Sequence, residues 1–238
     1  MNFIEGEILY INKPLHWTSF NVVNHIRWKI SRTFKLKKIK VGHAGTLDPL
    51  ATGVIIICTG KKTKLIESFQ EQTKEYIATL ELGATTPCFD KELPVDNTYP
   101  TEHITAELIE QVIPRFIGEI WQVPPVYSAV KIEGKRAYDY ARAGKNIALK
   151  PKLLVIDDID ILAFTPPLLK IRVVCSKGTY IRALARDIGR ALNSGAHLAA
   201  LERTKIGNIS LSDCMEIDVI IECIEIESKK TNNNIIAG

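Results

Sequence analysis

The sequence VGHAGTLDPLATGVIIICTGKKTK, from Val41 to Lys64, places one aspartate, Asp48, in a loop that contains glycines and leads into an apolar run. Two glycines precede Asp48 and allow backbone conformations closed to other residues, while Pro49 biases Asp48 toward an extended backbone. The β-branched run from Val54 to Cys58 predicts a short buried strand. The stretch therefore predicts a carboxylate that is presented by a stiff loop and backed by the core.

The charges around this loop are unusual. Asp48 is the only acidic residue between Glu7 and Glu67. The same interval has eleven basic residues: Lys13, Arg27, Lys29, Arg32, Lys35, Lys37, Lys38, Lys40, Lys61, Lys62 and Lys64. If these lie on one face, their field favours the charged form of Asp48. A turn-forming aspartate beside a solvated basic face remains open on the residues alone, because Asp and Pro are common in turns.

The whole chain has 238 residues, enough for one large domain or two small ones. The apolar fraction of 46% and the net charge of +4 fit a globular protein, and the contrast between the basic N-terminal quarter and the acidic segment 213–227 points to a polyanionic partner. Five widely spaced cysteines without a CxxC pair argue against disulfides and zinc, and no histidine pair has metal-ligand spacing. With no signal-like segment and no membrane span, we expect a cytoplasmic protein without a metal.

The hydrophobic patterns predict an α+β fold with one mixed, largely antiparallel sheet flanked by helices. Strands are predicted at 7–12, 54–58, 74–83, 153–162, 169–175 and 206–211, and helices at 19–30, 63–70, 105–118, 137–143 and 178–192. Residues 84–100 are predicted as an irregular loop, the segment from Asp213 as a short helix, and residues 229–238 as a disordered tail.

Three helical segments carry more detailed predictions. The first helix places Phe20, Val23, Ile26 and Ile30 toward the core, and the second places Leu65, Ile66 and Phe69 there. The helix at 178–192 has its apolar stripe on one face and Arg182, Arg186, Asp187 and Arg190 on the opposite face. The basic segment 32–40 is either a solvated connector or an edge that contacts phosphates.

The sequence Gly60-Lys61-Lys62 suggests a phosphate-binding loop, but its spacing does not fit one. A P-loop needs four residues between its first glycine and GK[ST], whereas Gly53 lies seven positions before Gly60 and Lys62 stands where Ser or Thr is required.

The motif GHAGTLDPLATGVI resembles the catalytic motif of the TruB-type tRNA pseudouridine synthases. The resemblance continues, in the family's order, through EILYINKPLHWTS, residues 59–64 and 74–83, PPVYSAVKIEGKRAYDYARAG, CSKGTYIRALARDIG and GAHLAALERT. It spans residues 5 to 210 and implies the pseudouridine synthase fold. It also implies isomerisation of uridine to pseudouridine at position 55, in the TΨC loop of tRNA, without cofactor or metal.

The resemblance implies a role for each matching residue. Asp48 matches the nucleophile, Arg182 the arginine that pairs with it, and Tyr76 the tyrosine that stacks on the flipped uracil. Tyr180 and Leu201 match pocket residues that contact the target nucleotide, and His43 matches the histidine that occupies the space left in the RNA loop. Lys13 and Lys64 match motif lysines near the site, with phosphate or structural roles.

The family comparison also sets the expected organisation. We expect a catalytic domain over residues 1–212, followed by a short acidic segment and polar tail at 213–238 in place of the C-terminal PUA domain that family members often carry. The chain is expected to act on tRNA as a monomer. The alternative is a catalytically inactive RNA-binding protein on the same fold, although a pure binder would not need Asp48, Tyr76 and Arg182 together.

Overall fold

A computed structural model of the chain describes residues 1–128, 130–132, 134–142 and 148–236. Its internal contacts divide the chain into two units. Unit 1 comprises Met1–Lys74 and Glu202–Gly238, and unit 2 comprises Glu75–Leu201. Both boundaries between the units fall inside the catalytic domain predicted at 1–212. The segment after residue 212 belongs to the same unit as the N-terminal residues. The domain assignment itself stays a prediction.

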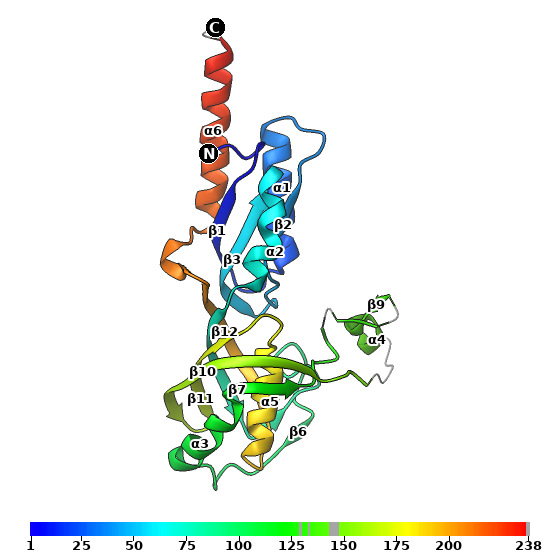
Figure 1. The fold of residues 1–238 in the computed structure, drawn as a ribbon, viewed down its shortest axis with the longest axis vertical. Helices are drawn as coiled ribbons and strands as arrows, with labels where there is room; N and C mark the ends of the chain where they lie inside the picture. Colours follow the sequence, from blue (N-terminus) through cyan, green and yellow to red (C-terminus); the bar gives the residue numbers. More distant parts are fainter. Residues whose placement is uncertain (129, 133, 143–147, 237–238) are drawn as a thin grey trace. The chain divides into compact units, whose positions relative to one another are not determined.

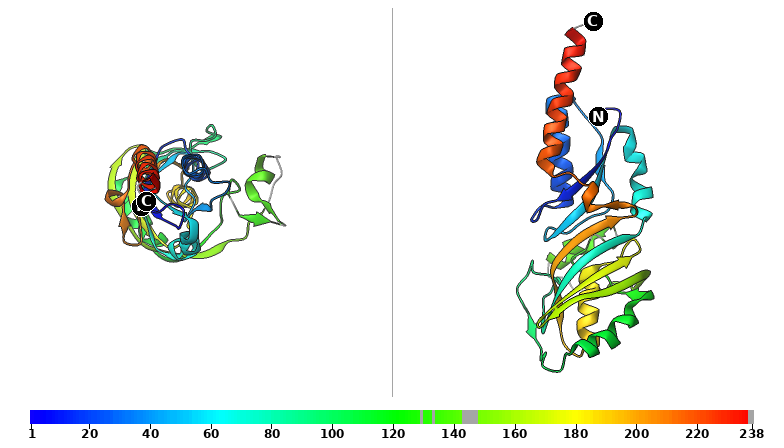
Figure 2. Two further views of the ribbon diagram at one scale, coloured as in Figure 1. Left: turned by 90° about the horizontal axis from the view of Figure 1, so that it is seen from above. Right: turned by 90° about the vertical axis from the view of Figure 1, so that its left-hand side faces the viewer.

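Unit 1 is a small antiparallel sheet with helices on both faces (Figures 1 and 2). Its strands are β1 (Ile8–Lys13), β2 (Val41–His43), β3 (Ala51–Thr59), the end of β12 (Ala196–Ile206) and β13 (Ile209–Ser210). Both β1 and β2 pair with β3 in antiparallel register, and β13 pairs with β12. The helical segments are α1 (Ser19–Thr33), η1 (Gly60–Leu65), α2 (Ile66–Glu71), η3 (Leu211–Asp213) and α6 (Ile217–Ile236).

Alternate side chains of β3 explain this layering. Ile55 and Ile57 pack with α1 and α6 on one face of the sheet. Val54, Ile56 and Cys58 form a second cluster on the other face, where α2 packs. Because β3 is covered on both faces, its sequence reads as a continuous apolar run rather than an alternating one, and the buried strand predicted at 54–58 is confirmed.

Unit 2 has the strand order β12-β4-β11-β10-β7. These are the first part of β12, β4 (Lys74–Leu82), β11 (Leu168–Cys175), β10 (Lys152–Thr165) and β7 (Gly118–Gln122), and β10 runs antiparallel to both β7 and β11. Two hairpins are added, β5 (Ala84–Thr85) with β6 (Asn97–Thr98) and β8 (Lys131–Ile132) with β9 (Lys135–Arg136). The helical segments are α3 (Ala106–Val112), η2 (Ile113–Phe116), α4 (Ala137–Arg142) and α5 (Ile181–Ala191). The predicted α+β class is confirmed, with largely antiparallel sheet pairing and flanking helices.

Some local predictions were wrong. Phe20 is 62% exposed, because the buried face of α1 is centred on Val22, Val23, Ile26 and Ile30. Leu65 is also exposed, at the end of the η1 turn, whereas Ile66 and Phe69 pack inward. The irregular loop predicted at 84–100 contains the β5–β6 hairpin. The end of the helix predicted at 137–143 lies outside the described residues.

The C-terminal predictions need the largest correction. Residues 229–236 are helical and continue α6, which was predicted as a short helix followed by a disordered tail. Ile220 and Ile224 of α6 are buried against α1 and the sheet, so tertiary packing of the apolar first half supports a helix that continues into a polar stretch. The strand predicted at 206–211 is wrong in its bounds: Ile206 ends the long strand β12, which was missed, and Ile209–Ser210 forms the separate strand β13. Among the described residues, no helix has the length and apolar character needed to cross a bilayer.

Candidate active site

The loop that carries Asp48 connects β2 to β3 and is held by hydrogen bonds at several points. The Ala44 amide donates to Ile56 at 2.9 Å, and the Ala51 amide closes a turn on the Asp48 carbonyl at 3.1 Å. Asp48 is half-buried, and its neighbour Leu47 is 4% exposed. The predicted stiffness of this loop therefore has a physical basis in backbone hydrogen bonds and in burial of Leu47.

The start of α1 is bonded to the same loop. The Ser19 hydroxyl donates to the Leu47 carbonyl at 3.2 Å and accepts from the Leu47 amide at 2.8 Å. Three residues before the start of α1, the His16 amide donates to the Pro49 carbonyl at 2.8 Å. Both residues that flank Asp48 are thus anchored to the segment that leads into α1.

Arg203 holds the other side of the loop. This β12 residue is 1% exposed, and its guanidinium donates to the carbonyls of Val54 at 2.7 Å, Gly45 at 3.1 Å and Thr46 at 3.3 Å. A rigid fork of five N–H donors suits an arginine to this task, because one side chain can bind several carbonyls at fixed angles. Gly53, at φ +100°, lets the strands approach: a Cβ there would lie 2.3 Å from the Arg203 carbonyl oxygen.

Lys13, at the end of β1, is a cation that interacts electrostatically with Asp48. It is fully buried, and its ammonium donates to the carbonyls of Pro14, at 2.9 Å, and Trp17. Burial lowers the pKa of Lys13 to about 8, the Asp48 carboxylate opposes that shift, and the Arg203 guanidinium adds to it. This burial favours a positioning role for Lys13 over direct contact with phosphate, and its predicted binding role stays a prediction.

We expect the single-turnover rate to fall as pH rises through about 8, because the Lys13 ammonium beside Asp48 then loses its proton. The measurement is the rate constant between about pH 6 and about pH 9.5. Lys13→Met should react more slowly at every pH and should not show the decrease in rate above about pH 8. A decrease that persists in Lys13→Met would belong to another titrating group.

The stability of the protein should change with pH in the opposite sense. Between about pH 8, the pKa of Lys13 in the folded protein, and pH 10.5, the ordinary pKa of lysine, the unfolded chain binds more protons than the folded one. The Lys13 contribution to the free energy of unfolding therefore rises across that pH range.

Two more predicted site residues lie in unit 1. His43 ends β2 and is half-buried; burial first, and then the Arg203 guanidinium, lower its pKa, which favours the neutral imidazole. A neutral ring suits a residue predicted to fill space in an RNA loop. Lys64 is exposed on η1, where its ammonium is accessible to a phosphate.

The remaining predicted residues belong to unit 2. Tyr76 lies on β4 among the residues whose side chains alternate inward, and it is 8% exposed. Leu201 is 9% exposed on β12. Tyr180 immediately precedes α5, where its backbone amide donates to the Gln122 side chain at 2.9 Å and its carbonyl accepts from it at 3.2 Å. The buried Gln122 amide thus fixes the start of α5 against β7.

Arg182, in the first turn of α5, is 5% exposed. Its guanidinium donates to the carbonyls of Cys88 and Tyr127, both at 3.0 Å, and its Nε lies 3.5 Å from a carboxylate oxygen of the buried Asp90. Arg186 is also buried, at 7%, so the predicted opposite face of this helix does not lie wholly in solvent. These charges are compensated inside unit 2, where the Arg186 guanidinium bonds Asp187 and lies over the ring of Phe89.

The predicted catalytic set thus divides between the units. Unit 1 brings together Asp48, His43 and Lys13, and unit 2 holds Tyr76, Arg182, Tyr180 and Leu201. The pairing of Asp48 with Arg182, and the stacking role of Tyr76, stay predictions.

Sequence reasoning missed Arg203 and Asp90. Arg203 stands in the matching block GAHLAALERT, but an arginine on a strand that alternates with polar residues reads as exposed. Asp90 lies in a segment that was predicted as irregular. Burial, together with the long-range hydrogen bonds of Arg203 and the ion pair of Asp90 with Arg182, identifies their roles. Within the described part of the chain, no group of three or more His, Cys, Asp or Glu residues could hold a metal ion.

Two family models match the chain. The model for the N-terminal domain of TruB family pseudouridylate synthases matches residues 32–181, and the model for the C-terminal domain of tRNA pseudouridylate synthase B matches residues 182–235. The chain is 65% identical over 225 residues to tRNA pseudouridine synthase B of Phocaeicola vulgatus, covering 94% of this chain and 96% of that protein. It is 48% identical to tRNA pseudouridine synthase B of Flavobacterium johnsoniae, covering 94% and 98%.

Solved structures agree with these matches. A chain in the crystal structure of a Cbf5-Nop10-Gar1 complex superposes with a TM-score of 0.67 at 27% identity, covering 92% of this chain and 54% of that one. A chain in an H/ACA RNP bound to a substrate RNA containing 2′-deoxyuridine gives 0.65 at 26% identity, with 92% and 53% coverage. This chain thus spans about half the length of each of those proteins. The family models cover almost all of it, and on this ground the chain belongs to the TruB family of pseudouridylate synthases.

Proposed function

We propose that this protein isomerises uridine 55, in the TΨC loop of tRNA, to pseudouridine, with Asp48 as the nucleophile. The observation that carries the proposal is the fixed loop. The loop that carries this one carboxylate is held by Ser19, whose hydroxyl bonds the Leu47 backbone, and by Arg203, which donates to the Gly45 carbonyl. The buried Lys13 ammonium interacts electrostatically with Asp48. Covalent catalysis by a carboxylate requires such an oriented, charged group.

The reaction breaks the bond between C1′ of the ribose and N1 of uracil and forms a bond between C1′ and C5. The C5 proton leaves, and N1 gains a proton. A uridine in a folded RNA loop must be flipped out before Asp48 can reach it. We assign Tyr76 to stacking on the flipped ring, Arg182 to pairing with Asp48, and Tyr180 and Leu201 to the nucleotide pocket.

Before and after the flip, other residues hold the RNA. His43, with its lowered pKa, takes the space that the uridine leaves. The exposed Lys64 binds a phosphate, and Lys13 maintains the charge balance at Asp48. We further propose that the enzyme is a cytoplasmic monomer that uses no metal or cofactor.

The segment 34–40 extends the proposed RNA surface. Phe34, Leu36 and Ile39 pack against the core of unit 1, and the lysines between them are exposed. This alternation directs a row of ammonium groups into solvent, which favours the phosphate-contacting interpretation of the segment.

Replacing Lys35, Lys37 and Lys38 together with glutamine should flatten the salt dependence of tRNA binding. Each lost phosphate contact lowers the slope of log K against log salt by roughly 0.7 to 0.9, so the slope should decrease by up to about 2 to 3. Filter binding or anisotropy over a salt series measures it. The matched control replaces three exposed lysines of other elements, Lys152, Lys170 and Lys229. An unchanged slope, or equal flattening in the control, would leave segment 34–40 a solvated connector.

The direct test of the function is incubation of the protein with an unmodified tRNA transcript, followed by chemical mapping of pseudouridine. We expect one modified position, 55. Tight binding without any pseudouridine would establish the alternative, an inactive RNA-binding protein. Modification at a different position would retain the chemistry and overturn the assigned site.

A further inference from the structure

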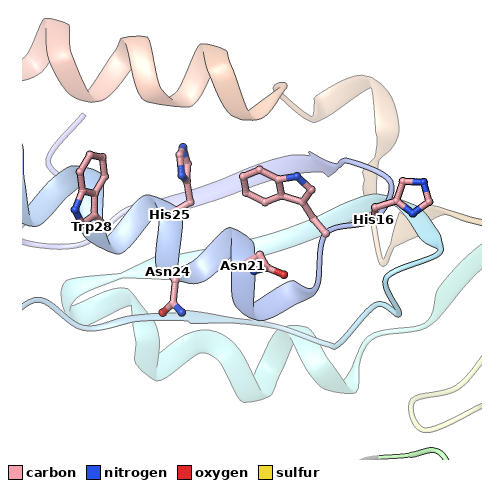
Figure 3. Close-up of a pocket in the computed structure, with 6 residues that line it drawn as sticks. His16, Asn21, Asn24, His25 and Trp28 are labelled. Carbon is pink, nitrogen blue, oxygen red and sulfur yellow. The ribbon is translucent and has the colours of Figure 1, made fainter. Parts of the chain in front are cut away.

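A pocket of about 420 Å³ lies along the first half of α1, in unit 1. Six residues line it: His16, Trp17, Asn21, Asn24, His25 and Trp28. Figure 3 shows His16 in the segment before α1 and Asn21, Asn24, His25 and Trp28 on successive turns of the helix. Trp17 also belongs to the segment before α1. Its volume is in the range of small-molecule sites, and no role predicted from the sequence uses any of the six.

The two asparagines present hydrogen-bond donors. The Oδ1 of Asn21 accepts from the Thr18 amide at 2.8 Å, and the Oδ1 of Asn24 accepts from the Arg27 guanidinium at 2.9 Å. Because a backbone amide and a guanidinium can only donate, these bonds fix which amide atom is oxygen. Neither amide nitrogen donates to another group in the described part of the protein, so the two NH₂ groups are available to a ligand with acceptor atoms.

Aromatic rings supply the flat surfaces. Trp17 packs edge-on against His25, with ring centroids 5.4 Å apart. Trp28 is 54% exposed although it lies on a helix with a large buried face, and the Arg32 guanidinium lies over its ring at 5.2 Å. An indole with a guanidinium on it is a platform for a planar, electron-rich ring. α1 has no acidic residue, so this helix offers no carboxylate to a cationic ligand.

The pocket adjoins the Asp48 loop. His16 lines the pocket, and its amide donates to Pro49, directly after Asp48. His16 also has a φ of +67°, a left-handed conformation that costs free energy in a residue other than glycine and is often found at binding sites. An RNA held at Asp48 would therefore lie within reach of the pocket.

We propose that this pocket binds an unpaired nucleobase of the RNA, other than the target uridine, by stacking on Trp28 and by donation from Asn21 and Asn24. The donor pair selects a base edge with acceptors, such as the carbonyl oxygens of uracil or guanine. This inference rests on the proposed function for the identity of the RNA and adds a second base-binding site to it.

The test compares Trp28→Leu, which keeps an apolar side chain but removes the π face, with Trp28→Phe, which keeps a face. We expect Trp28→Leu to raise the Kd for the unmodified tRNA transcript about fivefold or more, and to raise KM with it, because stacking of one base accounts for at least that factor. Trp28→Phe should keep most of the wild-type affinity for the transcript. The slope of log K against log salt should not change, since no phosphate contact is lost. Trp121→Leu, at the 70% exposed tryptophan of β7, is the matched control and should bind as the wild type does.

A second variant tests the donors. Asn21→Asp keeps an oxygen that accepts from the Thr18 amide but removes the NH₂ donor. If both side chains hold one base, the double variant with Trp28→Leu should lose less binding free energy than the sum of the two single losses. Wild-type affinity in Trp28→Leu, or full additivity, would overturn the pocket proposal and leave the site to another ligand. Failure of the proposed function is a separate outcome, because the wild-type protein would then form no pseudouridine in the same transcript.

Discussion

Asp48→Asn should abolish pseudouridine formation and leave tRNA binding within about tenfold of the wild-type value. The amide has nearly the shape of the carboxylate but is neutral and a poor nucleophile, so the covalent step is lost while the loop keeps its turn. We expect the single-turnover rate to decrease by at least about 10⁴-fold, a size typical of removing a group that reacts covalently. Chemical mapping of pseudouridine gives the rate, and anisotropy gives the Kd.

The loop should remain folded in this variant, because its anchors are backbone groups bonded to Ser19 and Arg203. Thermal unfolding checks that expectation. Asp157→Asn, at an exposed aspartate of β10, is the matched control for the loss of one carboxylate and should keep full activity. Full activity in Asp48→Asn would contradict the nucleophile assignment, and a large loss of binding would make Asp48 a determinant of RNA affinity instead.

Local patterns were sufficient for the parts of the fold that depend on local physics. The alternation in β4 and the continuous apolar run in β3 each extend over a few neighbouring residues, and both predicted strands are confirmed. Pro49 and the glycines of the loop with Asp48 are likewise visible in the sequence, whereas its hydrogen bonds to Ser19 and Arg203 are not.

The sequence could not predict features that depend on distant partners. The last turns of α6 are polar and give no local signal for a helix. They continue the first half of α6, which packs on α1. Acids in α6 also neutralise part of the basic N-terminal quarter, since Glu225 pairs with Lys29. The charge map alone therefore overstated the positive field of that quarter. Arg182 could be predicted as functional only through the family resemblance, because its partner Asp90 lies in an irregular segment.

Arg203 is the residue for which structure adds most, and we expect its replacement to affect both stability and turnover. Arg203→Met should lower the free energy of unfolding by about 3 to 5 kcal/mol, because buried carbonyls of Gly45, Thr46 and Val54 lose charged donors. Arg203→Lys keeps the charge, but one ammonium cannot bind three carbonyls in the geometry of the guanidinium fork. We expect a smaller loss of stability there, with kcat reduced about 10- to 100-fold, since a small displacement of a reacting group costs that much.

A purely structural role for Arg203 would reduce the amount of folded protein without changing the chemistry of the folded fraction. Two measurements separate these cases. Active-site titration in Arg203→Lys should give a reduced kcat per folded molecule with little change in KM. The pKa of His43, followed by NMR, should rise toward its ordinary value in Arg203→Met, because a neighbouring guanidinium that lowers it has been removed. An unchanged kcat per folded molecule would limit Arg203 to stability. An unchanged His43 titration would mean that burial alone sets that pKa, and that the field of Arg203 does not extend across the loop that holds Asp48.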